Sequence, residues 1–74
     1  MFSVQVFYRS SGNPAVSKRV SVGFEGLFRG HTNSQFTDSN GECHFNCDNG
    51  TGTIYVNESN VYKGTIKGRT IVYV

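Results

Sequence analysis

The side chains best suited to chemistry in this chain are two cysteines and two histidines. Cys43, His44 and Cys47 lie close together in the sequence, and His31 lies upstream. Thiolates and imidazoles are preferred ligands of zinc, so this group is a candidate metal site. In an extended strand, however, residues four apart are separated by about 13 Å, too far for one zinc ion or for a disulfide, whose Cα atoms lie within about 7 Å. His44 would point away from both cysteines. We therefore expect two reduced cysteines packed in a core beside Phe45, and a zinc site that breaks the strand is the alternative.

The acidic residues form no catalytic pattern, because they are spread over expected turns and no pair is placed across a cleft. The segment from Asp38 to Glu42 resembles a calcium-binding loop, but its glycine is the fourth residue, whereas an EF-hand loop needs glycine at the sixth position. Gly50-Thr51-Gly52 lacks the third glycine of a dinucleotide-binding loop, and the chain has no nucleophile elbow. We therefore expect a protein that is not an enzyme and has no cofactor and no bound metal.

A predicted turn indicates the two strands that hold these residues. Asn40-Gly41 stands between two segments of alternating polarity, Ser34 to Asp38 and Glu42 to Cys47. This dipeptide favours a type I′ turn, in which both central residues take positive φ and the twist matches that of the flanking strands. The sequence therefore predicts a β-hairpin, with Cys43, Phe45 and Cys47 on one face of its second strand.

Other segments also alternate with the two-residue period of strands. Strands are expected over 2–9, 16–24, 51–57 and 69–74, with a short one at 61–63, and Gly26 to Asn33 is expected to be a loop that holds Arg29, Gly30 and His31. Short strands at this spacing, with nine glycines and one proline among 74 residues, indicate an all-β fold. We expect one domain, residues 1–74, forming a small antiparallel β-sandwich of six to seven short strands, transthyretin-like or immunoglobulin-like.

Charge and hydropathy exclude several classes of protein. The net charge is +2 and the basic residues are scattered, so no basic block indicates a nucleic-acid arm or a membrane-binding patch. The longest apolar run, Ile71 to Val74, is far shorter than the roughly 20 residues that cross a bilayer. Met1 leads directly into a strand-like segment without the pattern of a signal peptide, so we expect a cytoplasmic protein.

Part of the chain resembles a known family. Thr37 to Phe45, which reads T-D-S-N-G-E-C-H-F, and Gly52 to Val56, which reads G-T-I-Y-V, are similar to the hairpin and the following strand of carboxypeptidase regulatory-like and collagen-adhesin B-type modules. Val20-Ser21-Val22 resembles the strand that precedes them. The family's Pro-Pro-Gly turn is replaced here by Asp48-Asn49-Gly50. The resemblance implies a transthyretin-like β-sandwich with a structural or binding role and no catalysis.

The function that we expect is binding of a protein, or of a second copy of the chain, through an exposed strand edge. Segments 2–9 and 69–74 carry apolar residues on both faces and contain neither proline nor an interior charge. A domain this small cannot cover both of these strands from both sides. The residues expected at this interface are Phe7, Tyr8, Arg9, Arg69, Val72 and Tyr73. Two alternatives are a nucleic-acid-binding barrel, with bases stacked on residues such as Phe7 and Tyr8, and a carbohydrate-binding module that uses Tyr55 and Tyr62.

Overall fold

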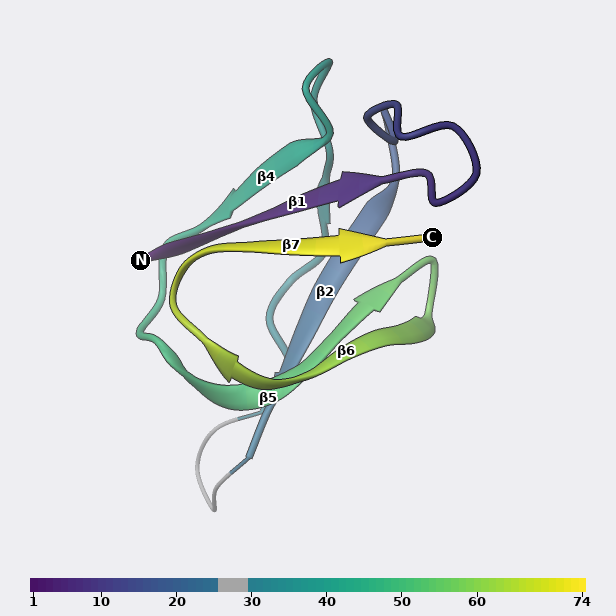
Figure 1. The fold of residues 1–74 in the computed structure, drawn as a ribbon. Helices are drawn as coiled ribbons and strands as arrows, with labels where there is room; N and C mark the ends of the chain where they lie inside the picture. Colours follow the sequence, from purple (N-terminus) through teal and green to yellow (C-terminus); the bar gives the residue numbers. More distant parts are fainter. Residues whose placement is uncertain (26–29) are drawn as a thin grey trace.

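The computed structural model describes residues 1–25 and 30–74, and its described part contains seven strands and no helix. The strands form two sheets that enclose one core (Figure 1). The predicted all-β sandwich of six to seven short strands is thereby confirmed. The strands are β1 (Phe2–Phe7), β2 (Arg19–Phe24), β3 (Gln35–Phe36), β4 (Glu42–Phe45), β5 (Gly50–Val56), β6 (Ser59–Ile66) and β7 (Gly68–Tyr73).

The two sheets have different pairing patterns. The four-stranded sheet has the order β3-β2-β5-β6 and is antiparallel throughout. The three-stranded sheet has the order β4-β1-β7, in which β1 runs antiparallel to β4 but parallel to β7. Within the expected antiparallel sandwich, the first and last strands therefore run side by side in the same direction (Figure 1).

The core follows from the alternation of the strands. In β1, Phe2, Val4 and Val6 are buried while the residues between them are only partly covered. The ring of Phe2 stacks on that of Phe45 at 5.2 Å and meets that of Phe24 edge-on at 5.8 Å, joining the two sheets at one end. The remaining buried hydrophobic residues come from both sheets and one loop: Ala15, Val20, Val22, Cys43, Ile54, Val56, Ile66 and Val72.

The predicted β-hairpin does not form, because β3 pairs with β2 and β4 pairs with β1, so the two strands lie in different sheets. The turn between them lies where it was predicted, but its type was predicted wrongly. The N–H of Gly41 donates to the Asp38 carbonyl at 2.9 Å, and the N–H of Asp38 donates to the Glu42 carbonyl at 2.9 Å. Ser39 and Asn40 are therefore the central residues, and Gly41 alone has a positive φ, +77°. This is a type I turn followed by a glycine bulge. The Asp38 carboxylate accepts the N–H groups of Asn40 and Glu42, at 2.8 and 3.0 Å.

A turn with positive φ at both central residues occurs instead between β5 and β6. Asn57 and Glu58 have φ of +50° and +71°, and Val56 pairs with Ser59 across them. The turn expected at Glu58-Ser59-Asn60 thus begins one residue earlier, and Ser59 and Asn60 belong to β6.

One further expectation needs correction. The strand expected from Val16 begins only at Arg19, because Ser17 has a φ of +58°, and the side chain of Val16 is 48% exposed instead of sharing the core face. Of the expected loop from Gly26 to Asn33, Arg29 lies outside the described residues. His31 lies beside Gly23, to which it forms an isolated β-bridge.

Candidate binding surface

The cysteines and histidines of the candidate metal site do not converge. Cys43 is buried on the core face of β4, and burial raises the pKa of its thiol to about 12. Cys47 lies beyond the end of β4 and is half-buried while still packing against the core, so the fully buried strand face expected for Cys43, Phe45 and Cys47 holds only for the first two. Among residues 1–25 and 30–74, no three potential ligands lie together in a way that could hold a metal ion.

The expected strand edge is correct for one of the two segments. Segment 2–9 was predicted to be an edge, but β1 is the central strand of its sheet, covered on one side by β4 and on the other by β7. β7 is an edge strand: β1 is its only partner within the described residues. It follows β6 after a bend near Lys67, and the two strands belong to different sheets.

The direction of the β7 backbone groups follows from its last hydrogen bonds. The N–H of Val74 donates to the Phe7 carbonyl at 2.9 Å, and its carbonyl accepts the N–H of Arg9 at 2.8 Å. In a parallel pair, alternate residues direct both groups toward the partner strand. The intervening residues Arg69, Ile71 and Tyr73 therefore direct their N–H and C=O groups toward the free side of β7.

Four of the six predicted interface residues lie on the outer face of the three-stranded sheet. Phe7 and Tyr73 pack with ring centres 6.2 Å apart, and the Arg9 guanidinium lies 6.0 Å from the centre of the Tyr73 ring. Arg69, at the other end of β7, lies 3.7 Å from the Glu42 carboxylate. Ile71, 44% exposed, has the same parity as Tyr73, 49% exposed. We call Phe7, Ile71 and Tyr73 the outer-face patch.

The other two predicted interface residues lie elsewhere. Val72 is 2% exposed and belongs to the core, because its parity on β7 is opposite to that of Ile71 and Tyr73. Tyr8 follows Phe7 directly and points to the opposite side, where it lines a groove. The prediction missed Ile71, although its alternation with Val72 was visible in the sequence.

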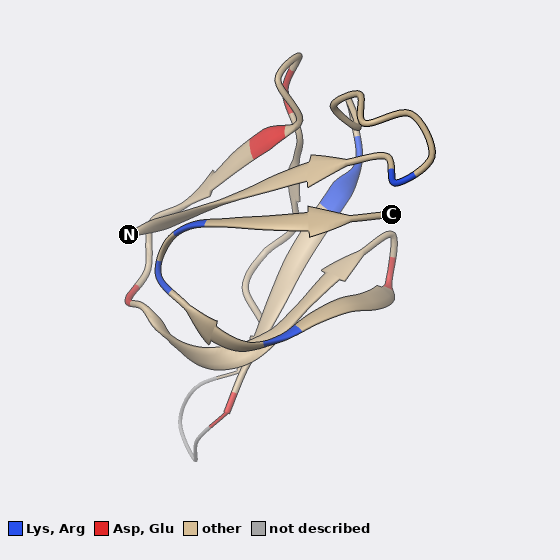
Figure 2. Ribbon diagram, in the orientation of Figure 1, with Lys and Arg blue, Asp and Glu red and all other residues tan. Residues whose placement is uncertain are grey.

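The remaining sheet edges are better protected against pairing than β7. β3 has two residues, and the four residues of β4 include Glu42 and His44. β6 carries Lys63 and an irregularity at Val61, which is left unpaired because Asn60 and Tyr62 pair with the consecutive residues Tyr55 and Ile54 of β5. β7 has no charged residue after Arg69 and no proline (Figure 2). Charges and irregularities are usual devices that block edge pairing, and β7 beyond Arg69 has neither.

The two tyrosines of the carbohydrate alternative do not form one platform. Tyr62 pairs with the buried Ile54 and packs against the core, and its hydroxyl donates to the Thr65 carbonyl at 2.7 Å. Tyr55 points to the other face, where the His31 ring lies with its centre 5.6 Å away. A sugar could therefore not stack on both rings at once.

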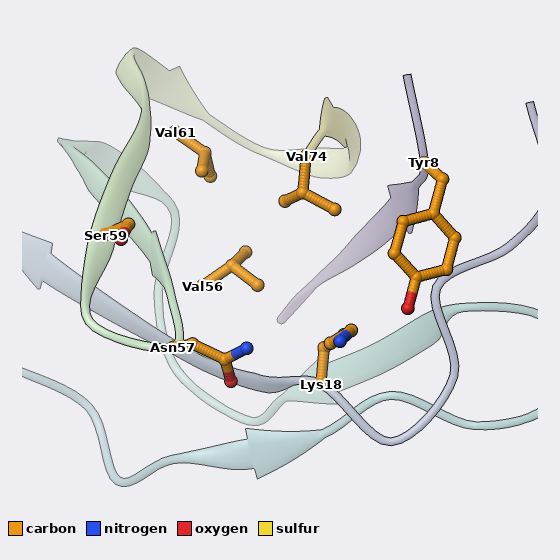
Figure 3. Close-up of a pocket in the computed structure, with 7 residues that line it drawn as sticks. All are labelled: Tyr8, Lys18, Val56, Asn57, Ser59, Val61 and Val74. Carbon is orange, nitrogen blue, oxygen red and sulfur yellow. The ribbon is translucent and has the colours of Figure 1, made fainter. Parts of the chain in front are cut away.

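A groove of about 420 Å³ opens at the end of the sandwich to which β7 leads (Figure 3). Three valines give it an apolar wall, and polar side chains stand at its rim. Thr37 fixes the loop at this rim: its hydroxyl donates to the Ala15 carbonyl at 2.6 Å and accepts the N–H of Lys18 at 2.9 Å. The lining residues are Tyr8, Lys18, Val56, Asn57, Ser59, Val61 and Val74.

Comparison of the chain with protein-family models, with curated proteins and with solved structures finds no match. In the described residues there is no helix with the length and apolar character needed to cross a membrane.

Proposed function

We propose that this protein is a non-catalytic binding module that adds a strand of another chain to the free edge of β7. The observation that carries the proposal is the unpaired edge itself: the N–H and C=O groups of Arg69, Ile71 and Tyr73 face away from β1. Backbone hydrogen bonds to an added strand give affinity, and side chains on alternate positions give specificity.

The outer-face patch supports the same proposal. An added strand would extend the sheet and place its own outward side chains beside Ile71 and Tyr73, two large hydrophobic residues that are about half exposed. Arg9 and Arg69 lie near the two ends of this row and would limit the register of the added strand. The occupant is a second copy of the chain or a different protein, and measurements on the purified protein distinguish the two.

We propose a cytoplasmic protein, since Cys43 and Cys47 are both free thiols, which is typical of a reducing compartment. We also propose that the chain belongs to the carboxypeptidase regulatory-like family, and the motif residues quoted above and the two-sheet fold support this proposal.

The test compares two substitutions of exposed valine or isoleucine by lysine. Ile71→Lys places a charge on the β7 edge, and Val16→Lys places the same charge on a loop residue of similar exposure, 48% against 44%. Self-association is measured by sedimentation velocity, and strand addition by the fluorescence anisotropy of a labelled Thr-Val-Thr-Val-Thr-Val peptide with an amidated C-terminus.

We expect Ile71→Lys to weaken whichever association occurs by about tenfold or more, because lysine on an edge strand opposes pairing, and Val16→Lys to leave it unchanged. Equal thermal unfolding temperatures of the variants would show that both are folded. Equal association of the two variants, or a wild-type protein that neither self-associates nor binds the peptide in either its amidated or its free-acid form, would refute the proposal. A steep loss of nucleic-acid affinity with salt would favour the nucleic-acid alternative instead.

A further inference from the structure

The groove beyond the end of β7 has one apolar side and one side made of hydrogen-bond donors. The apolar side consists of Val56 at the end of β5, Val61 in β6 and Val74 directly after β7. These side chains converge on one space from both sheets (Figure 3). An apolar wall of this kind suits an aliphatic side chain.

The donor side consists of Lys18, Asn57 and Tyr8. The Oδ1 atom of Asn57 accepts the N–H of Arg19 at 3.3 Å, which fixes the amide so that its NH₂ group points toward Lys18 (Figure 3). The Lys18 Nζ atom lies 5.4 Å from the centre of the Tyr8 ring. An ammonium group and an amide NH₂ thus stand at the same end of the groove, and both donate hydrogen bonds.

In the part of the chain that the structure describes, no acidic side chain forms an ion pair with Lys18. None of the groove's lining residues is acidic. Among the described residues, Arg19 pairs with Glu58, and both Arg69 and His44 pair with Glu42. None of these ion pairs includes Lys18. The groove therefore fits a ligand that combines an aliphatic group with a carboxylate.

We propose that the groove binds the C-terminal residue of the strand that pairs with β7. The aliphatic side chain of this residue packs on Val56, Val61 and Val74, and its terminal carboxylate accepts hydrogen bonds from Lys18 and Asn57. This inference rests on the proposed function, since the groove lies where a strand parallel to β7 arrives at its own carboxyl end. The partner is thus defined by its chemistry: an extended C-terminal segment that ends in an aliphatic residue.

The experiment uses two labelled peptides that differ in one group. Both have the sequence Thr-Val-Thr-Val-Thr-Val with an N-terminal fluorophore, one with a free C-terminal carboxylate and the other with an amidated C-terminus. Their anisotropy is measured with the wild-type protein, with Lys18→Gln, and with the control Lys67→Gln, which removes an exposed lysine at the bend before β7. Sodium octanoate serves as a competitor that carries an aliphatic chain and a carboxylate but no strand.

We expect the free acid to bind the wild type about tenfold more tightly than the amide, as a hydrogen-bonded charge pair contributes. Lys18→Gln should remove this difference, and Lys67→Gln should retain it. Equal binding of the acid and the amide peptides to the wild type would overturn the inference. So would an inhibition constant of octanoate equal to the dissociation constant of the free-acid peptide.

The two proposals fail in different ways. If Ile71→Lys weakens both peptides but the carboxylate has no effect, β7 accepts a strand and the groove does not read its end. If the acid binds in a Lys18-dependent way and Ile71→Lys has no effect, the groove binds a terminal carboxylate without strand addition, and the proposed function is wrong.

Discussion

Gly41 is the residue whose replacement should reveal most about how the sheets are joined. It has a φ of +77°, a region that residues with a side chain rarely adopt. A Cβ atom at this position would also overlap the carbonyl oxygen of Val6. That oxygen accepts the N–H of Ala15 at 2.8 Å, and the N–H of Val6 donates to the Gly41 carbonyl at 2.8 Å. Gly41→Ala therefore combines backbone strain with the displacement of a hydrogen-bonded strand.

Two other glycines separate these causes. Gly12 has a φ of +75°, and a Cβ atom there would meet no atom within 4 Å beyond its chain neighbours, so Gly12→Ala measures the strain alone. Gly52 has no positive φ, but a Cβ there would overlap the Gly23 carbonyl oxygen, so Gly52→Ala measures the displacement alone. The left-handed conformation costs about 1–2 kcal/mol for a residue with a side chain, and disturbing a buried hydrogen bond costs about 1–3 kcal/mol.

We therefore expect the free energy of unfolding to fall by about 1 kcal/mol for Gly12→Ala, about 2 for Gly52→Ala and about 3 for Gly41→Ala. Since a domain of this size is stabilised by only about 4–11 kcal/mol in total, Gly41→Ala should remove at least a quarter of the stability. Urea denaturation followed by far-ultraviolet circular dichroism gives the three values under one set of conditions. Equal losses for Gly41→Ala and Gly12→Ala would refute the contact with Val6, and no loss for Gly41→Ala would refute the turn itself.

Four further predictions concern single side chains. Glu58→Gly should stabilise the protein by about 1 kcal/mol in urea denaturation, because glycine adopts a φ of +71° without strain and only an exposed ion pair is lost. The control Glu58→Ala loses the same ion pair but keeps a Cβ atom, so it should not stabilise the protein. Thr37→Val should cost about 1–3 kcal/mol, because two backbone groups lose their partner, whereas an unchanged midpoint would contradict the observed hydrogen bonds. Native Cys47 should react with a thiol reagent faster than Cys43, whose burial raises the pKa of its thiol to about 12; equal rates would show that this part of β4 opens readily. Hydrogen bonds from the backbone N–H groups of Glu42 and Asn40 lower the pKa of Asp38. The stabilising effect of its carboxylate should therefore be complete above the unfolded pKa near 3.8 and be lost as the pH falls through the lower folded pKa. The difference in melting temperature between the wild type and Asp38→Asn should shrink toward pH 2.

Local sequence patterns were sufficient for the strands but not for all of their boundaries. The alternation of Phe2, Val4 and Val6 identified β1, and the glycine after Asn40 marked the turn before β4. The turn type was predicted wrongly because it depends on a carboxylate, that of Asp38, which binds the N–H groups of the turn and stabilises negative φ at the central residues. Asn57-Glu58 was not recognised as a turn with two positive φ values because glutamate is rarely found there.

The candidate binding surface was predictable only in part, because an edge is a property of the whole sheet. The sequence of β1 resembles that of β7, with apolar residues on both faces, and only the pairing of distant strands decides which of the two has a free side. The parity of Arg69 and Tyr73 was readable from the sequence, and so was that of Val72, which the prediction nevertheless placed at the interface. The groove could not be predicted, since its walls come from four separate segments of the chain.

The parallel pairing of β1 with β7 also determines the order in which the protein can fold. Residue 2 pairs with residue 68, so this contact closes a loop of almost the entire chain, and contacts of such sequence separation form slowly. Until β7 has been synthesised, β1 has only β4 as a neighbour, and the edge that is later covered stays open to other chains. We expect β7 to dock last on the ribosome. The strand that we propose as the binding edge is therefore also the strand whose departure would expose a second edge, that of β1, beneath it.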